Sequence, residues 1–123
     1  MKDIATVKSR LLAVKIVNLY KMLCYEKKEF VMARQILKAG TSIGANLAEA
    51  EFAFSVKDYI SKKSIALKEC AEALYWLEIL NETGFLDREL FMELKTECTG
   101  ILKLLQSSIK TTRIKHQRTN RKN

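Results

Sequence analysis

Most enzyme sites that transfer protons depend on histidine, and this sequence has one histidine, His116, near its C-terminal end. A Ser–His–Asp or Cys–His site needs a histidine held rigidly beside its nucleophile. A di-iron helical bundle uses Glu-x-x-His pairs on facing helices, and this sequence contains no such pair. The sequence therefore argues against these catalytic schemes and predicts a protein that is not an enzyme, with no catalytic residues.

Two carboxylates, Glu69 and Glu72, lie three residues apart on one face of a predicted helix. Such a pair could ligate a metal or act as acid and base. Carboxylates on a helix surface are commonplace, however, and pair readily with nearby lysines such as Lys62 or Lys68. We therefore interpret this pair as structural.

The three cysteines, Cys24, Cys70 and Cys98, are far apart and form no Cys-x-x-Cys motif. Each lies among apolar residues at helical spacing, which is typical of buried thiols in a reducing compartment. A structural zinc site needs four close ligands. The closest glycine pair, Gly40 and Gly44, lacks the Lys-Ser/Thr of a phosphate loop. We expect neither a metal nor a cofactor.

Positive charge is concentrated at the end of the chain. The net charge is +8, and the last eleven residues, 113–123, hold five cations and no acid. Such a segment can bind nucleic acid or another polyanion, or it can be a disordered, solubilising end. The candidate phosphate-binding residues are Arg113, Lys115, Arg118, Arg121 and Lys122.

A second group of lysines lies on the third predicted helix, where Lys62 and Lys63 are adjacent. A solvated helix face is the simple interpretation of this group. It becomes a phosphate-binding patch if assembly of several copies multiplies the charge. We include both lysines among the candidate nucleic-acid contacts.

The elements that must position these residues are helices, because the sequence has no proline, only four glycines, and abundant Ala, Leu, Lys and Glu. Short connections predict that consecutive helices are antiparallel neighbours, which gives an all-α, up-and-down four-helix bundle. The predicted helices cover about residues 3–25, from Phe30 or Val31 to Phe54, from Ser55 to Gly84, and from Asp87 to near Thr112.

The first helix carries two adjacent apolar stripes, so its apolar face is unusually wide. Such a face can contact more than its neighbours in the bundle. We take the width as a sign of self-association. The stripes are Ile4, Val7, Leu11 and Val14, and Leu12, Ile16, Leu19 and Leu23.

The second helix contains a run of small residues, 39–46, that includes Gly40 and Gly44. Each helical glycine costs about 1 kcal/mol relative to alanine, so a compensating close approach of another helix or subunit is expected. The alternative is a loop that splits the helix. The apolar stripe of this helix is predicted to run on through Ala50 to Phe54.

Local sequence marks the ends of the later helices. Ser55 and Asp58 predict a capping box in which Asp58 reaches back to the N–H of the cap. Gly84 is suited to the left-handed conformation after a helix, and Asp87 can cap the fourth helix.

The adjacent aromatics Tyr75 and Trp76 point about 100° apart on their helix, so both cannot face one core. We expect one to pack inside and the other to fill a subunit interface. Stacking on nucleobases is a weaker alternative, because neither ring has a basic flank.

The length of 123 residues fits one domain, and we place its boundary with the basic tail between residues 112 and 113. Lys8, Arg10 and Lys15 interrupt the apolar N-terminal stretch, which argues against a signal peptide. The longest uncharged run, 39–48, is too short to cross a bilayer. We therefore expect a cytoplasmic protein without membrane contact.

The sequence resembles a known bacterial family along residues 5–112. The resemblance lies in three stretches: Gly40-Thr-Ser-Ile-Gly-Ala-Asn-Leu-Ala-Glu-Ala50, Asp58-Tyr-Ile-Ser-Lys62 with Ile65-Ala-Leu-Lys-Glu-Cys70, and Glu72-Ala-Leu-Tyr-Trp-Leu77. The family comprises four-helix bundles first noticed as reading frames inside intervening sequences of bacterial large-subunit ribosomal RNA genes, and it carries a ribosomal-protein label for that reason. Lys38-Ala39 stands where the family often has Arg-Ser or Arg-Ala, and Gly44 stands where many members have proline.

This resemblance implies a four-helix bundle and a ring-like homo-oligomer, with a pentamer favoured. A fold relative that resembles this family is the accessory protein of diversity-generating retroelements, which works with a reverse transcriptase and its RNA. Fold analogy does not establish a reaction. We therefore expect a non-enzymatic, oligomeric, RNA-associated protein, with a protein-interaction scaffold as the alternative.

Overall fold

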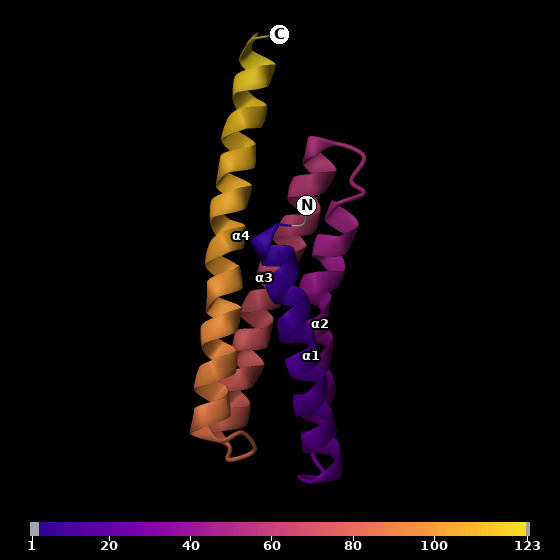
Figure 1. Ribbon diagram of the computed structural model, residues 1–123, viewed down its shortest axis with the longest axis vertical. Coiled ribbons are helices and arrows are strands. Elements are labelled where there is room, and N and C mark those ends of the chain that lie inside the picture. The colour runs from indigo at the N-terminus through magenta and orange to yellow at the C-terminus, as the bar shows by residue number, and fades with distance from the viewer. Residues whose placement is uncertain (1–2, 123) are drawn as a thin grey trace.

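The computed structural model describes residues 3–122, and those residues form four helices in antiparallel succession (Figure 1). This arrangement confirms the predicted all-α four-helix bundle. The helices are α1 (Ile4–Tyr25), α2 (Val31–Ala50), α3 (Val56–Glu82) and α4 (Arg88–Lys122).

Each helix packs against two neighbours, so the bundle has a four-sided section. α1 and α3 both contact α2 and α4, and they lie diagonally across the core from each other. The contact between α1 and α4 is the least extensive of the four. An ion pair reinforces it, because the Lys15 ammonium lies 2.6 Å from the Glu97 carboxylate and 3.6 Å from that of Glu93.

Side-chain caps begin three of the helices and supply acceptors that the first turn lacks. The Asp3 carboxylate accepts from the N–H of Thr6 at 2.8 Å, and the Asp87 carboxylate accepts from that of Leu90 at 2.8 Å. The Ser55 hydroxyl accepts from the N–H of Asp58 at 3.0 Å. The predicted caps at Ser55 and Asp87 are thus confirmed.

The Asp58 carboxylate does reach back, although to a different donor from the one predicted. It accepts from the N–H of Phe54, one residue before the cap, at 3.1 Å. At the other end of α3, Gly84 has φ of 83°, the left-handed conformation predicted for it.

α2 is continuous through its small residues, so the predicted alternative of a loop at 39–46 is wrong. The reason is a close contact with α1. A Cβ added at Gly40 would lie 2.8 Å from two side-chain carbons of Ile16, and one added at Gly44 would lie 3.3 Å from the Ser9 hydroxyl. Side chains at these two positions would hold the helices apart.

The prediction that the apolar stripe of α2 continues to Phe54 is wrong. The helix ends at Ala50, and the N–H groups of Phe52 and Ala53 bond back to the carbonyls of Glu49 and Ala50 in a tight turn. The capped start of α3 follows immediately. Phe54 is consequently 98% exposed and takes no part in the core.

The end predicted for the last helix, near Thr112, is also wrong, because α4 runs on to Lys122. Residues 101–122 contain neither proline nor glycine to stop it. Cations near a helix C-terminus are favoured by the helix dipole, and the hydroxyls of Thr112 and Thr119 donate to carbonyls four residues earlier.

The two apolar stripes of α1 have different surroundings. Leu12, Ile16, Leu19 and Leu23 are buried in the core, whereas Ile4, Val7, Leu11 and Val14 are exposed. The bundle therefore leaves one full apolar stripe of α1 without a partner in this chain.

Candidate nucleic-acid interface

The final part of α4 extends past the end of the bundle as an isolated helix (Figure 1). Its last residue inside the core is Ile109, which is 5% exposed. Beyond it, the face that continues the core stripe carries Thr112, His116 and Thr119 instead of apolar residues. We call residues 110–122 the tail half of α4, and residues 88–109 its bundle half.

The tail half is cationic and solvated. Arg113, Lys115, Arg118 and Arg121 are exposed, and none of them forms an ion pair within residues 3–122. The last acidic residue of the chain is Glu97, about three and a half turns before the tail half begins. The fifth predicted contact, Lys122, is the last residue of the helix, and the position of its side chain is not described.

One line of polar residues follows the outer face of α4 at spacings of four and three. Gln106, Lys110, Arg113 and Gln117 line a shallow groove of about 360 Å³ between α3 and α4, over an apolar floor formed by Leu67, Ile109 and Ile114. Arg121 continues this line one turn further. Because Lys115 and Arg118 lie on other faces, cations surround more than half of the helix.

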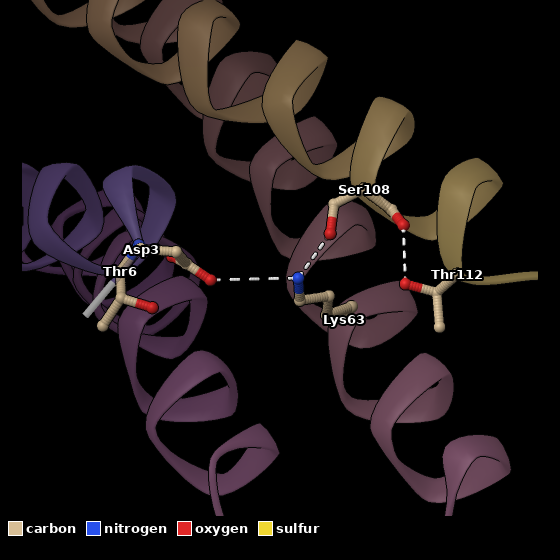
Figure 2. Close-up of polar contacts among 5 residues, drawn as sticks. All are labelled: Asp3, Thr6, Lys63, Ser108 and Thr112. Atoms are coloured by element: carbon tan, nitrogen blue, oxygen red, sulfur yellow. Dashed lines mark hydrogen bonds and ion pairs between the residues drawn. The ribbon is translucent and has the colours of Figure 1, made fainter. Parts of the chain in front are cut away.

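The structure corrects the prediction for Lys63, which is 4% exposed and points into the bundle. Its ammonium group donates to the Ser108 hydroxyl and lies 3.9 Å from the Asp3 carboxylate (Figure 2). It also lies 4.6 Å from the centre of the Tyr59 ring. Buried lysines are rare unless paired, and this one ties the start of α1 to α3 and α4. It has no access to a phosphate group in this arrangement.

Lys62, the neighbouring candidate, stays at the surface. Its ammonium group lies 3.7 Å from the Glu49 carboxylate, so part of its charge is already balanced. The structure therefore brings four predicted cations together on the tail half and leaves the two predicted lysines of α3 apart from them.

The aromatic pair on α3 divides between surface and interior. Tyr75 is 55% exposed, whereas Trp76 packs half-buried against the core, and the rings meet edge to face with centres 5.0 Å apart. The Trp76 Nε1 is buried and has no hydrogen-bond partner in the described residues. Neither ring lies on the tail half.

Glu69 has one buried carboxylate oxygen without a partner. Burial, aided by the neighbouring carboxylate of Glu72, raises the pKa of Glu69 above its ordinary value. No cluster of three or more His, Cys, Asp or Glu side chains within residues 3–122 could hold a metal ion.

The three cysteines are buried, as expected for unreactive thiols. The Cys98 thiol donates to the Cys70 carbonyl at 3.5 Å, which joins α3 to α4 inside the core. The adjacent Cys98 and burial together raise the pKa of the Cys70 thiol, so the thiolate that would attack an electrophile is disfavoured.

Two exposed aromatic residues were not predicted to be exposed: Phe52 was not singled out, and Phe54 was expected in the apolar stripe of α2. Phe52 and Phe54 lie in the short connection between α2 and α3, with exposed fractions of 81% and 98%. The signal that could have found them is the pattern Phe-Ala-Phe directly before the Ser55 cap, because a connection this short leaves little protein to cover two rings.

No helix among residues 3–122 is long and apolar enough to cross a membrane.

Comparison with known proteins identifies relatives of the bundle. A family model described as 23S rRNA-intervening sequence protein matches residues 2–107. A crystal structure of a protein of unknown function from the S23 ribosomal protein family of Bacteroides thetaiotaomicron is 53% identical in sequence, with a TM-score of 0.86. The similarity covers 87% of this chain and 96% of that one. No curated protein matches.

The family match includes nearly all of the bundle and ends before the tail half, so the cations at 113–122 lie outside it. The helix arrangement agrees with that of the solved relative, whose function is unknown. On the extent of the match, this chain belongs to the 23S rRNA-intervening sequence protein family.

Proposed function

We propose that this protein is a non-enzymatic oligomer that binds RNA through the tail half of α4. The observation that carries the proposal is the projecting helix with five exposed, unpaired cations, which are Lys110 and the four predicted ones, and no acid among its described residues. A helix of this kind contacts phosphates from several directions. Binding of this type releases counterions, so it is salt-dependent and only weakly selective for sequence.

Salt dependence gives the sharpest test. Binding of a fluorescently labelled structured RNA is measured by anisotropy at several salt concentrations, with the full chain and a chain ending at Thr112. The slope of log K against log salt is about −0.9 for each neutralised phosphate of a duplex. We expect the shortened chain to lose most of its affinity and to show a much shallower slope.

A charge-only variant separates the effect of charge from that of length. It replaces the five cations of residues 113–122 by glutamine and keeps a helix-forming sequence. The matched control replaces Lys27 and Lys28, two exposed lysines in the turn between α1 and α2, by glutamine. Equal losses in these two variants, or an unchanged slope in the shortened chain, would exclude the tail half as the RNA contact.

We also propose that the protein self-associates through α1. The exposed stripe Ile4, Val7, Leu11 and Val14 borders a groove of about 450 Å³ between α1 and α2, whose lining includes Val7, Leu11 and Ala45. Contiguous exposed apolar surface of this kind marks protein contacts. A closed ring would repeat the tail around its axis and multiply phosphate contacts, and a pentamer is the size we favour.

Light scattering tests self-association directly. We expect the full chain to be larger than a monomer at micromolar concentration and the double variant Val7→Ser with Leu11→Ser to shift toward the monomer. If the parent chain is a monomer at these concentrations, the proposal of self-association through α1 is wrong. The localisation that suits an RNA partner and three buried free thiols is the cytoplasm.

The α1 stripe also supports the alternative function, a scaffold that binds a different protein through the same apolar face. A pull-down from native lysate distinguishes the two functions. A protein partner that survives nuclease treatment and is lost from the Val7→Ser, Leu11→Ser variant would favour the scaffold.

A further inference from the structure

The connection between α2 and α3 presents two aromatic rings to solvent. Phe52 and Phe54 are among the most exposed large apolar side chains of residues 3–122. The residue between them, Ala53, is half-buried. Neither ring is part of the core, and each keeps its apolar surface in contact with water. Two exposed rings in one short connection make this surface a candidate for contact with a ligand.

The backbone around these rings is fixed at both sides. The N–H of Phe52 bonds to the Glu49 carbonyl at 3.0 Å, and the N–H of Phe54 bonds to the Asp58 carboxylate at 3.1 Å. The Ser55 cap begins α3 directly afterwards. A connection with its polar groups satisfied in this way presents the rings without a large further loss of entropy on binding.

The connection that carries the rings lies at the same end of the bundle as the tail half of α4 (Figure 1). Phe54, Ser55 and Tyr59 line a hollow of about 360 Å³ whose other side includes Thr112 of α4. Lys115 and His116 follow on the same face of α4 one turn later. One hollow thus has an aromatic ring on one side and leads to the cations on the other.

Charged residues of both signs lie near the rings. Glu49 is paired with Lys62 at 3.7 Å, and Asp58 accepts from the Phe54 N–H, which is a neutral donor. Glu51 also lines the hollow and is exposed. Lys57, Lys62 and the tail cations outnumber these three acids at this end of the molecule.

We propose that Phe52 and Phe54 stack against unpaired bases of the RNA whose phosphates contact the tail half, so that the preferred ligand contains a single-stranded segment. This inference rests on the proposed function and names its substrate class. A phenylalanine ring stacks on any base because every base has a π-face, whereas bases inside a duplex offer no free face to a side chain. The cations supply affinity for either form, and the rings select the unpaired one.

A second copy of the chain is the competing occupant, and the rim of the ring site argues against it. Besides the two rings and Ala48, the adjacent hollow is lined by Glu49, Asp58 and Lys62. The centres of protein interfaces are depleted in charged residues. The aliphatic stripe of α1 has the character of such a centre, and the ring site does not.

The test compares two labelled probes by anisotropy at low salt: a twelve-nucleotide oligouridine, which has little structure of its own, and a blunt RNA duplex of twelve base pairs. The variant is the double substitution Phe52→Ala with Phe54→Ala. We expect it to lose about tenfold or more of its affinity for the single strand. Its affinity for the duplex and the salt slope should stay within about twofold of the parent.

Two control variants test whether the loss of affinity depends on these two rings and on their aromatic faces. Tyr25→Ala removes an exposed ring, 73% exposed, at the opposite end of the bundle and should change neither affinity. Phe52→Leu with Phe54→Leu keeps apolar side chains but removes the aromatic faces, so it should behave like the alanine variant. Circular dichroism and light scattering, run on each variant, check the fold and the assembly.

Several outcomes would overturn the inference. These are an unchanged single-strand affinity in the alanine variant, equal losses on both probes, full activity of the leucine variant, or dissociation of an assembly in the alanine variant. The last result would assign the rings to a contact between copies. If the parent chain binds neither probe, the proposed function itself fails. If it binds both and the rings make no difference, only the stacking fails.

Discussion

The two halves of α4 form one uninterrupted helix, yet the first half buries side chains in the core and the second half exposes its side chains to solvent. In the bundle half, residues 88–109, the helix buries Leu94, Cys98 and Ile101. Two of its acids, Glu93 and Glu97, pair with Lys15 of α1. In the tail half, residues 110–122, the same backbone carries exposed cations without acidic partners. The difference teaches that helix formation and core formation are separable here: packing stabilises one half, and helix continuity with a favourable dipole stabilises the other.

The largest expected effect comes from the bundle half. Leu94→Ala removes a side chain with no exposed surface and leaves a cavity, so we expect a loss of about 2–5 kcal/mol in the free energy of unfolding. Ending the chain at Thr112 removes no core residue and should cost less than about 1 kcal/mol. Urea unfolding, at one fixed protein concentration, measures both.

A shortened chain as unstable as Leu94→Ala would break this contrast, because the tail half would then contribute to the fold. In RNA binding we expect the opposite order, with a loss in the chain ending at Thr112 and none in Leu94→Ala. At a temperature where Leu94→Ala is folded, its RNA affinity should equal that of the parent.

A smaller effect is expected at the boundary between the halves, where Lys63 binds Ser108. Lys63→Met removes the ammonium group and leaves the Ser108 hydroxyl without its donor and Asp3 without its partner, so we expect a loss of about 1–2 kcal/mol. The neighbouring change Lys62→Met removes an exposed pair and should cost less than about 0.5 kcal/mol.

The same two variants sharpen the functional assignment. RNA affinity should be unchanged in Lys63→Met, because its ammonium group is buried. A tenfold loss of affinity in a folded Lys63→Met protein would show that this lysine reaches the ligand after all and that the bundle rearranges on binding.

The smallest effect is a gain of stability within the bundle half. Nothing lies within 4 Å of a Cβ added at Gly100, so Gly100→Ala should stabilise the protein by about 0.5–1 kcal/mol through helix propensity. In Gly40→Ala, by contrast, the new Cβ would lie 2.8 Å from side-chain carbons of Ile16, so this variant should be less stable than the parent protein. Thermal unfolding of both variants checks the opposite signs, and equal signs would mean that the space around one glycine is not as described.

Local signals explain which parts of the fold were predictable. Ser55, Gly84 and Asp87 mark helix ends through interactions within a few residues, and the prediction succeeded there. Phe54 continued a helical apolar pattern, but a tight turn ended the helix four residues earlier. Periodicity cannot show such a turn when no glycine or proline marks it.

The candidate site shows a different limit. The tail cations were recognisable from composition, while their helical conformation was not, because a run of cations is equally typical of a disordered end. The burial of Lys63 depends on Ser108, which is 45 residues away in the sequence. Charge alone indicated a surface position, and only the packing of three helices reveals the buried one.

The continuity of α4 has a mechanical consequence. Because residues 113–122 extend the same rod that is anchored in the core, they form a lever of about 15 Å that rotates with the body of the protein. A probe attached at Gln117 would report the tumbling time of the whole particle, because α4 is one helix from the core to Lys122.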